Sequence, residues 1–455
     1  MQFQKPREMD NGVPPFTTFD VDTAAAEQQA WWAQTRRDLA TLGVFDRTGE
    51  YAVNPLVVPR RIWREISDNV PRLIQAARRV VASSPDYLRW TRDDVRALIL
   101  AYADKPRRPP IARPDGIFVG ETLQLLELNI DSGLGGIFET DFVQHHLRLL
   151  PALAALDDES IPTGLQSMLG VIRALRETIA LEQCDVAIVA YPDFPPRYLE
   201  QSHQLADAIT REVRGATGHV VFPDALAGRG RWVSDDARSY QILWRDGATT
   251  HPEPKSRPMV RALFGACDTE TVVMSDPADL GVDGKMALAA LSEAEESGGV
   301  GLSEAEAALV RKHVPWTRVV GARSVVYVGT AYDLPTLLRE RQHELVLKRT
   351  QSKSGQHFFS GAEQPVTEWQ ARVEAALTDS IPWVVQRNVR SSPVDFCYMD
   401  ESGNTRVESQ RYLYSPYVFG DRCGPALIRV ERDPQNRRVG LPATSPVAMA
   451  GTVIG

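Results

Sequence analysis

One short stretch, residues 113–129, constrains the fold of this chain more than any other part of its sequence. Two apolar segments in it flank a Gly-Glu turn signal, which predicts a β-hairpin with strands at 116–119 and 122–129. Because alternate residues of a strand share a face, Glu127 and Asn129 point one way and the leucines beside them point the other. The polar side chains of the second strand are therefore expected on one face of the hairpin.

One end of this hairpin gathers oxygen ligands and a guanidinium group. If the turn centres on Glu121, Asp115 lies across from Glu127. Carboxylate and amide oxygens are ligands that Mg²⁺ accepts, with phosphate oxygens completing its coordination, and Arg113 offers a fork suited to phosphate. The alternative is an ordinary solvated hairpin end, but Glu127 interrupts an apolar run, and a buried acid needs a partner. We therefore expect Asp115, Glu127 and Asn129 to form a magnesium site.

The composition of the chain argues against several classes of protein. Its 455 residues suffice for two or three subdomains, and 43% apolar and 24% charged residues are ordinary for a globular protein. A net charge of −8 argues against a general nucleic-acid binder. The 4 cysteines are too far apart for a zinc motif or a disulfide framework, and no apolar run has membrane length. We expect a cytoplasmic protein without nucleic-acid or membrane partners, and the sequence leaves its oligomeric state open.

The first part of the chain, residues 1–110, reads as a helical region with a scaffold role. Apolar residues at helical spacing predict helices at 23–42, 59–83 and 90–103. Pro71 falls inside the second of them, and we expect it to kink that helix or to split it in two.

Residues 111–182 combine the hairpin with a glycine-containing segment and two further helices. The segment at 130–136 has three glycines in four residues, which permits close approach of the backbone to a ligand. A flexible turn between strand and helix is the alternative interpretation. The helices are predicted at 141–156 and 165–181.

Residues 183–300 are predicted to form a second α/β unit. Strands are expected at 185–191, 218–222 and 240–244, with a helix at 197–214 between the first two. This spacing predicts a βαβ unit with parallel strands. No Gly-x-Gly-x-x-Gly follows the first strand, which argues against a dinucleotide site.

Residues 301–390 contain a basic strand, loop and strand. A strand at 344–349 ends in basic residues, and small and hydroxylic residues fill the loop at 350–356. Backbone N–H groups and hydroxyls there, with Lys348 and Lys353, are suited to cover a triphosphate. The glycine spacing is not that of a Walker A motif, and an ordinary basic hairpin is the alternative.

The order of these motifs resembles a known family. Arg-x-Asp, followed one hairpin later by Glu-x-Asn, is similar to the magnesium site of glutathionylspermidine synthetase-type enzymes. These enzymes are circularly permuted ATP-grasp ligases, in which the metal hairpin precedes the nucleotide lysines. The lysine-bearing strand, the small-residue flap, a Trp-bearing helix at 368–377 and a strand at 382–389 follow in the family's order. A lysine that opens a helix within the segment 283–291 also looks like part of the family.

The resemblance implies an α/β, circularly permuted ATP-grasp fold. A Rossmann-like domain at 183–300 would precede a nucleotide-binding subdomain at 301–390, and 391–455 would complete the ATP-grasp core. The strand predicted at 412–419 would return to the hairpin.

The resemblance also implies ATP and Mg²⁺ as cofactors, with Arg113 holding the transferring γ-phosphate. In this family the strand at 382–389 is the adenine hinge, so the backbone at 385–387 would bond the adenine edge and Gln386 would lie near the sugar or base. The implied nucleotide contacts are Lys312, Lys348, Lys353, Ser354, Gly355, Gln386 and Arg387.

The implied activity is amide or peptide bond formation on a small molecule. ATP-grasp ligases phosphorylate a substrate carboxylate, and an amine then displaces phosphate from the acyl phosphate. This chemistry needs charge neutralisation and exclusion of water more than a nucleophilic side chain, and the sequence has no Gly-x-Ser-x-Gly, His-Glu-x-x-His or paired Cys/His motif. A small-molecule kinase on the same scaffold and a non-catalytic nucleotide-binding protein are the alternatives. The sequence identifies neither the carboxylate nor the amine.

Overall fold

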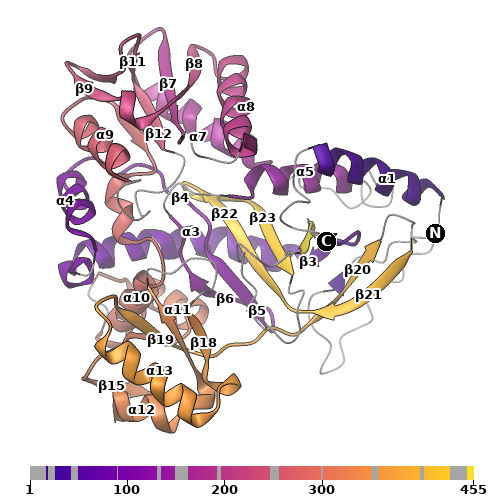
Figure 1. Cartoon of the computed structure of the whole chain (residues 1–455), viewed down its shortest axis with the longest axis vertical. Coiled ribbons are helices and arrows are strands. Elements are labelled where there is room, and N and C mark those ends of the chain that lie inside the picture. The colour runs from indigo at the N-terminus through magenta and orange to yellow at the C-terminus, as the bar shows by residue number, and fades with distance from the viewer. Residues whose placement is uncertain are drawn as a thin grey trace.

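The computed structural model describes most of the chain as a mixed α/β protein, with a central sheet crossed by a long helix and a lobe on either side (Figure 1). In Figure 1 the upper lobe carries β7–β12 and the lower lobe carries β15–β19. The described residues are 17–18, 26–41, 50–89, 91–130, 135–148, 162–191, 196–245, 256–298, 301–350, 357–399, 404–430 and 448–454.

The central sheet joins the predicted hairpin to the C-terminal part of the chain. Its main path runs β2-β24-β23-β22-β5-β6, and β4 pairs with β22 beside this path. The pairing of Tyr414 with Gly116 confirms that the strand predicted at 412–419 returns to the hairpin. The strands are β2 (Glu50–Tyr51), β4 (Ile111–Ala112), β5 (Asp115–Val119), β6 (Thr122–Glu127), β22 (Tyr412–Phe419), β23 (Arg422–Val430) and β24 (Ala448–Ala450).

The N-terminal region contains the predicted helices and also strands that were not predicted. Helix α3 continues through Pro71 without a break, which corrects the expectation of a split. Its apolar face is buried, with Ile66, Val70 and Ile74 at most 1% exposed. The elements are α1 (Ala26–Thr41), α3 (Arg60–Ala82), η1 (Pro85–Leu88), α4 (Asp93–Tyr102), β1 (Thr17–Thr18) and β3 (Leu56–Val58). Strand β3 pairs with β25 (Thr452–Ile454), so opposite ends of the chain share one small sheet.

The upper lobe is built on four parallel strands in the order β13-β12-β7-β8. Helix α8 connects β7 to its parallel neighbour β8, which confirms the βαβ prediction. The elements are β7 (Cys184–Val189), α8 (Pro196–Glu212), β8 (Ala216–Val221), β12 (Ile242–Arg245), α9 (Arg257–Cys267) and β13 (Val272–Met274). A small antiparallel sheet adds β9 (Ala227–Arg229), β10 (Trp232–Ser234) and β11 (Ser239–Tyr240), and η2 (Pro223–Ala225) precedes it.

Along the chain, two helices follow the hairpin and precede the strands of the upper lobe. They are α5 (Ile137–Arg148) and α7 (Gly164–Thr178). Helix α5 begins four residues before the position predicted for it, and the part predicted after residue 148 lies outside the described residues.

The lower lobe contains an antiparallel sheet in the order β14-β19-β17-β18. The sheet strands are β14 (Thr317–Val319), β17 (Leu345–Arg349), β18 (Phe358–Ser360) and β19 (Trp383–Arg387). A separate hairpin pairs β15 (Ser324–Tyr327) with β16 (Thr330–Asp333). The helices are α10 (Met286–Glu296), α11 (Glu304–His313), α12 (Leu334–Glu340), η4 (Gln342–Glu344), η5 (Gly361–Glu363) and α13 (Val366–Thr378). A further hairpin, β20 (Val394–Met399) with β21 (Thr405–Gln410), precedes β22.

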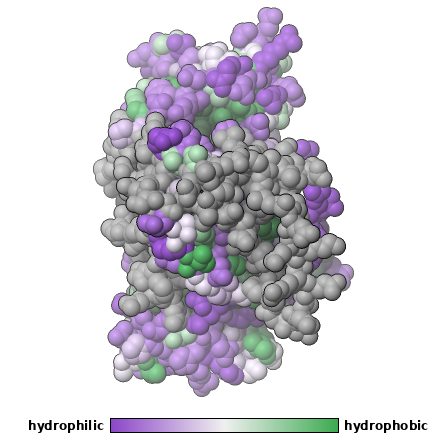
Figure 2. Space-filling model, turned by 90° about the vertical axis from the view of Figure 1, so that its right-hand side faces the viewer, coloured by the Kyte–Doolittle hydropathy of each residue, from purple (hydrophilic) through white to green (hydrophobic). Residues whose placement is uncertain are grey.

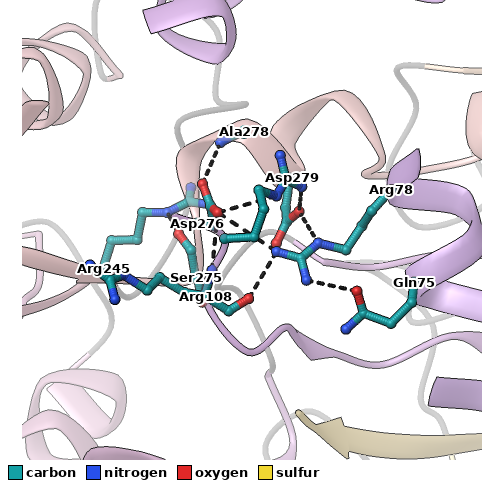
Figure 3. A network of polar contacts seen from close by, with 9 residues as sticks. Gln75, Arg78, Arg108, Arg245, Ser275, Asp276, Ala278 and Asp279 are labelled. Atoms are coloured by element: carbon teal, nitrogen blue, oxygen red, sulfur yellow. Dashed lines mark hydrogen bonds and ion pairs between the residues drawn. The ribbon is translucent and has the colours of Figure 1, made fainter. Parts of the chain in front are cut away.

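Four charged side chains tie α3 to the linker that enters the hairpin (Figure 3). Arg78 Nε lies 2.7 Å from Asp279 Oδ1, and its Nη2 lies 3.6 Å from Asp276 Oδ2. Arg107 of the linker contacts the same two carboxylates, at 2.5 Å and 3.4 Å. We call these four residues the α3 cluster. The two aspartates belong to or adjoin η3 (Pro277–Gly281).

The α3 cluster lies where the upper lobe meets this linker. Arg245, fully buried at the end of β12, donates from Nε to the carbonyl of Ser275 at 3.0 Å. Ser275 immediately precedes Asp276, as Figure 3 shows. The cluster therefore joins three segments of the chain that are distant in sequence.

The described surface of both lobes is mainly hydrophilic when seen from the side that carries the chain termini in Figure 1 (Figure 2). Among the described helices, none is both long enough and apolar enough to cross a membrane.

Candidate active site

The predicted hairpin forms with the predicted cross-strand pair. Gly120 adopts a positive φ of 57°, a conformation that glycine reaches without strain, and β5 and β6 pair in antiparallel fashion around it. Asp115 faces Glu127, which confirms the expected pairing. Of the two carboxyl side chains, that of Asp115 is buried and that of Glu127 is 28% exposed.

A β-bulge in the hairpin creates this pairing. The register changes between Gly116, which faces Leu125, and Asp115, which faces Glu127, so Leu126 is the extra residue of β6. A bulged residue leaves backbone groups outside the ladder. The carbonyl oxygen of Leu126 accepts a hydrogen bond from Lys348 Nζ at 3.3 Å, which connects the hairpin to β17 of the lower lobe.

Two arginines hold the carboxylate of Asp115. Arg429 Nη2 lies 2.6 Å from Asp115 Oδ1, and Arg113 Nε lies 3.5 Å from the same oxygen. Burial raises the pKa of Asp115, but the charges of Arg429 and Arg113 outweigh that effect and hold the pKa at about 2. Asp115 is therefore an anion at every physiological pH.

Two hydrogen bonds join Arg113 and Asn129 across the base of the hairpin. The backbone N–H of Arg113 donates to the carbonyl of Asn129 at 2.7 Å, and Asn129 Nδ2 donates to the carbonyl of Arg113 at 2.9 Å. Arg113 Nη1 also donates to the carbonyl of Gly135 at 2.6 Å. These contacts fix both side chains beside Asp115.

Lys285 pairs with the second carboxylate of the hairpin. Its Nζ lies 2.9 Å from Glu127 Oε2, and the residue stands immediately before α10. Gly284, with a positive φ of 94°, forms an antiparallel bridge to Leu128. Asp283 accepts a hydrogen bond from the backbone N–H of Ile130 at 2.8 Å. The segment before α10 is thus fastened along β6, and it delivers Lys285 to Glu127.

Lys348 is a buried lysine held by amide and carbonyl oxygens. Its Nζ donates to Gln386 Oε1 at 2.6 Å, and Gln386 Nε2 donates to Thr317 Oγ1 at 2.9 Å. Burial lowers the pKa of Lys348 to about 7, and the charge of Lys285 acts in the same direction. A negatively charged ligand beside it would favour its protonated form.

These contacts assemble a hairpin cluster with more positive than negative charge. Its members are Arg113, Asp115, Glu127, Lys285, Lys348 and Arg429. With Lys348 protonated, four cations face two carboxylates, and all of these residues except Glu127 are buried. The arrangement is suited to a polyanion that brings its own divalent cation.

The hairpin supplies a donor set that fits Mg²⁺. Asp115 and Glu127 face each other, and the amide of Asn129 lies two residues beyond Glu127. Within the described residues, no group of three or more His, Cys, Asp or Glu side chains could hold a metal ion. Two carboxylates and an amide are nevertheless an adequate protein contribution, because Mg²⁺ commonly retains water and phosphate ligands.

Comparisons with known proteins reveal a similarity of fold. The sequence matches no family model and no curated protein sequence. The structure resembles the apo form of a glutathione synthetase-like effector (GSS30) from Globodera pallida, with a TM-score of 0.59, 10% sequence identity, and coverage of 96% of this chain and 100% of that one. The chain thus has a mixed α/β fold similar to that of this glutathione synthetase-like structure.

Two more solved structures show weaker similarity. A putative γ-glutamylcysteine synthetase from Methylobacillus flagellatus KT gives a TM-score of 0.41 at 11% identity, covering 80% of this chain and 83% of that one. D-alanyl-alanine synthetase A from Vibrio cholerae gives 0.26 at 8% identity, covering 60% and 89%.

In this glutathione synthetase-like fold, one predicted nucleotide residue lies apart from the hairpin cluster. Lys312 Nζ pairs with Glu65 Oε1 of α3 at 2.7 Å, and its side chain is 44% exposed. This contact does not support a phosphate-binding role for Lys312.

The strand of the predicted adenine hinge is an inner strand of its sheet. Strand β19 lies between β14 and β17, so the backbone at 385–387 already makes ladder hydrogen bonds to its neighbours. The backbone N–H of Arg387, for example, donates to the carbonyl of Trp316 at 2.8 Å. The side chain of Arg387 is exposed. Gln386 instead directs its side chain to Lys348.

The predicted flap residues Lys353, Ser354 and Gly355 lie outside the described residues. Two members of the hairpin cluster, Lys285 and Arg429, were not assigned to the site from the sequence. Lys285 had a sequence signal, since it opens a helix, whereas the pairing of Arg429 with Asp115 joins residues from opposite halves of the chain.

Proposed function

We propose that this protein is an ATP- and Mg²⁺-dependent carboxylate–amine ligase that forms an amide or peptide bond on a small molecule through an acyl phosphate. The observation that carries the proposal is the excess of buried positive charge in the hairpin cluster. Unbalanced buried charge is costly, and a bound triphosphate would offset it. The similarity to a glutathione synthetase-like structure supports a ligase of the ATP-grasp type.

Asp115, Glu127 and Asn129 would hold Mg²⁺, which would neutralise charge on the phosphates. Arg429 keeps Asp115 ionised and fixes its position, since its Nη2 also donates to Ser415 Oγ at 3.1 Å. Glu127 would exchange its contact with Lys285 for the metal, and that exchange would release Lys285 toward a phosphate.

The cationic side chains of the cluster would bind the phosphates of ATP. Lys285 and Lys348 would take the nucleotide phosphates, and Arg113 would take the γ-phosphoryl group. Gln386 would orient Lys348 through their hydrogen bond. The flap residues Lys353, Ser354 and Gly355 would cover the triphosphate. The place of the hairpin before the flap in the chain supports a circularly permuted arrangement.

The reaction needs positioned charge more than a nucleophilic side chain. A carboxylate oxygen of the substrate attacks the γ-phosphorus, the bond between the β- and γ-phosphates breaks, and ADP leaves. The amine nitrogen then attacks the acyl carbon and loses a proton, and phosphate leaves as the C–N bond forms. Arg113 and the two lysines stabilise the charge that develops on the phosphates.

Both substrates are small molecules in this proposal, and the enzyme would act in the cytoplasm. None of the four cysteines, all within the described residues, forms a disulfide bond, which is consistent with a reducing compartment.

The test is ADP release with mass spectrometry of the products, on a panel of amino acids and other small carboxylates. The correct carboxylate alone should give slow ADP release, and the correct amine should accelerate it, with one ADP and one phosphate per amide. Hydroxylamine should intercept the acyl phosphate as a hydroxamate. A persistent phosphorylated product, formed at a rate indifferent to any amine, would instead identify a kinase.

A further inference from the structure

A buried carboxylate close to the hairpin cluster has an oxygen with no partner. Glu139 lies in the first turn of α5 and is 8% exposed. Its Oε1 accepts from Gln201 Nε2 of α8 at 3.4 Å, near the limit of a hydrogen bond. Within the described part of the chain, its Oε2 is buried and has no hydrogen-bond partner. A buried carboxylate oxygen without a partner costs free energy, so its retention requires an explanation.

Glu139 acts electrostatically on Tyr417, whose hydroxyl contacts the same carbonyl as Arg113, and we call this region the corner of the site. The hydroxyl of Tyr417 and Nη1 of Arg113 both donate to the carbonyl of Gly135, at 3.2 Å and 2.6 Å. Burial raises the pKa of Tyr417 to about 12, and the charges of Arg113 and Glu139 both act on that hydroxyl.

The neighbouring donors are already engaged. The hydroxyl of Tyr417 is directed at Gly135, and the hydroxyl of Thr140 donates to the carbonyl of Gly136 at 2.6 Å. The position of Glu139 in the first turn of a helix favours a negative charge through the helix dipole. The dipole explains the sign of the charge, but it supplies no donor to the unpartnered oxygen. A ligand with N–H donors and a positive charge would satisfy it.

We propose that Glu139 binds a cationic ammonium group of the amine substrate. This inference rests on the proposed ligase function and adds to it the charge of the second substrate. An ammonium group carries three donors and a positive charge, so it matches the unpartnered oxygen in both respects. Binding at this corner would place the amine beside Arg113, the residue proposed to hold the transferred phosphoryl group. The amine substrate is then one that carries a positive charge at neutral pH, rather than a neutral amide.

The test compares Glu139→Gln with Glu200→Gln in the full-length protein. Glu200 is exposed on α8 one residue before Gln201, so its substitution removes the same charge without altering the corner. Binding of putrescine and of glycinamide is measured by calorimetry in the presence of Mg²⁺ and a non-hydrolysable ATP analogue. Loss of a charge-assisted hydrogen bond predicts that Glu139→Gln weakens binding of at least one probe by about tenfold or more. Glu200→Gln should bind both probes as the wild type does.

A second measurement separates recognition of the amine from the ligase chemistry. Hydroxylamine is uncharged at neutral pH, so its capture of the acyl phosphate should not need Glu139. Glu139→Gln should retain wild-type rates of hydroxamate formation while it loses affinity for the cationic probes. Equal probe binding by wild type and Glu139→Gln, parallel loss of both readouts, or no binding of either probe by the wild type would each overturn the proposal. An absence of hydroxamate with the wild-type protein would instead contradict the ligase function, and the calorimetry would still decide the role of Glu139.

Discussion

The α3 cluster and the hairpin cluster are both buried groups of arginines and carboxylates, but they differ in charge balance. In the α3 cluster, each of two arginines contacts both aspartates, so the charges are equal. In the hairpin cluster, Arg113, Lys285 and Arg429 face two carboxylates, and Lys348 adds a fourth cation when it is protonated. A balanced buried group holds chain segments together without a ligand, whereas an unbalanced one is suited to binding a ligand of opposite charge.

The two clusters also shift the pKa of their buried aspartates in opposite directions. Burial raises the pKa of Asp279 to about 6 despite its two arginines, with the charge of Asp276 acting in the same direction. Burial also acts on Asp115, but Arg429 and Arg113 outweigh it and hold the pKa at about 2. The comparison teaches that contact with arginine alone does not identify a functional carboxylate; the sum of the surrounding charges is informative.

The largest expected effect is on folding stability, at the α3 cluster. Arg78→Met removes one of the two cations that face Asp276 and Asp279, and loss of one partner of a buried ion pair costs about 3–5 kcal/mol. Denaturant titration should show this loss in the free energy of unfolding. Glu121→Gln removes the partner of Arg61 in an exposed pair at the hairpin tip, and it should cost less than about 1 kcal/mol. An equal loss of unfolding free energy in the two variants would contradict the structural role given to the α3 cluster.

The next effect is on turnover, at the hairpin cluster. Glu127→Gln removes an anionic Mg²⁺ ligand, so we expect ATP turnover to fall by about 100-fold or more, the scale for losing one group that stabilises transition-state charge. Its unfolding free energy should change far less than that of Arg78→Met, because Glu127 is partly exposed and has one ionic partner. Glu121→Gln again serves as the control. Wild-type turnover in Glu127→Gln would remove the hairpin from the active site.

A smaller effect is expected on nucleotide affinity. Lys348→Met removes a charge-assisted contact to phosphate worth about 1.5–3 kcal/mol. This loss corresponds to a dissociation constant for ATP that is about 10- to 150-fold larger. Lys312→Met is the matched control, because Lys312 pairs with Glu65 and should leave the constant unchanged. A fluorescent ATP analogue measures both, and a larger loss in Lys312→Met would restore the nucleotide role predicted for it from the sequence.

The smallest effect is a pH dependence with opposite signs for binding and stability. Lys348 has a pKa of about 7 in the folded protein and an ordinary value of 10.5. Above pH 7 the free protein loses the proton that phosphate requires, so ATP affinity should fall as pH rises, by at most about tenfold per unit. The unfolded chain keeps that proton longer, so Lys348 makes the folded state more stable as pH rises from about 7 toward 10.5. Lys348→Arg should abolish both slopes, because arginine stays protonated.

The local parts of the site could be predicted from the sequence. A turn centred on Glu121 was expected to place Asp115 opposite Glu127, and the structure confirms that pair. The turn instead joins Val119 to Thr122, so a regular ladder would have placed Asp115 opposite Leu126. The bulge that produces the pairing was not visible in the sequence, because it depends on how β6 meets the rest of the sheet. The hydrogen bond from Lys348 Nζ to the carbonyl of Leu126 depends on this bulge, so no sequence pattern indicated it.

The contacts between distant segments could not be predicted from local patterns. Arg429 reaches Asp115 through the alignment of β23, β22 and β5, which is a tertiary property. Whether a strand such as β19, the predicted adenine hinge, has a free edge is likewise a tertiary property that local patterns do not reveal. Short strands such as β3 pair with the opposite end of the chain, so their partners are equally hidden.

The most direct test of the central claim is a crystal structure with Mg²⁺ and a non-hydrolysable ATP analogue. The account predicts a metal ion coordinated by Asp115 and Glu127, with the phosphates in contact with Lys285 and Lys348. The Lys285 ammonium should then have left Glu127 for a phosphate oxygen. A nucleotide bound elsewhere, with the ion pair of Lys285 and Glu127 unchanged, would contradict the account.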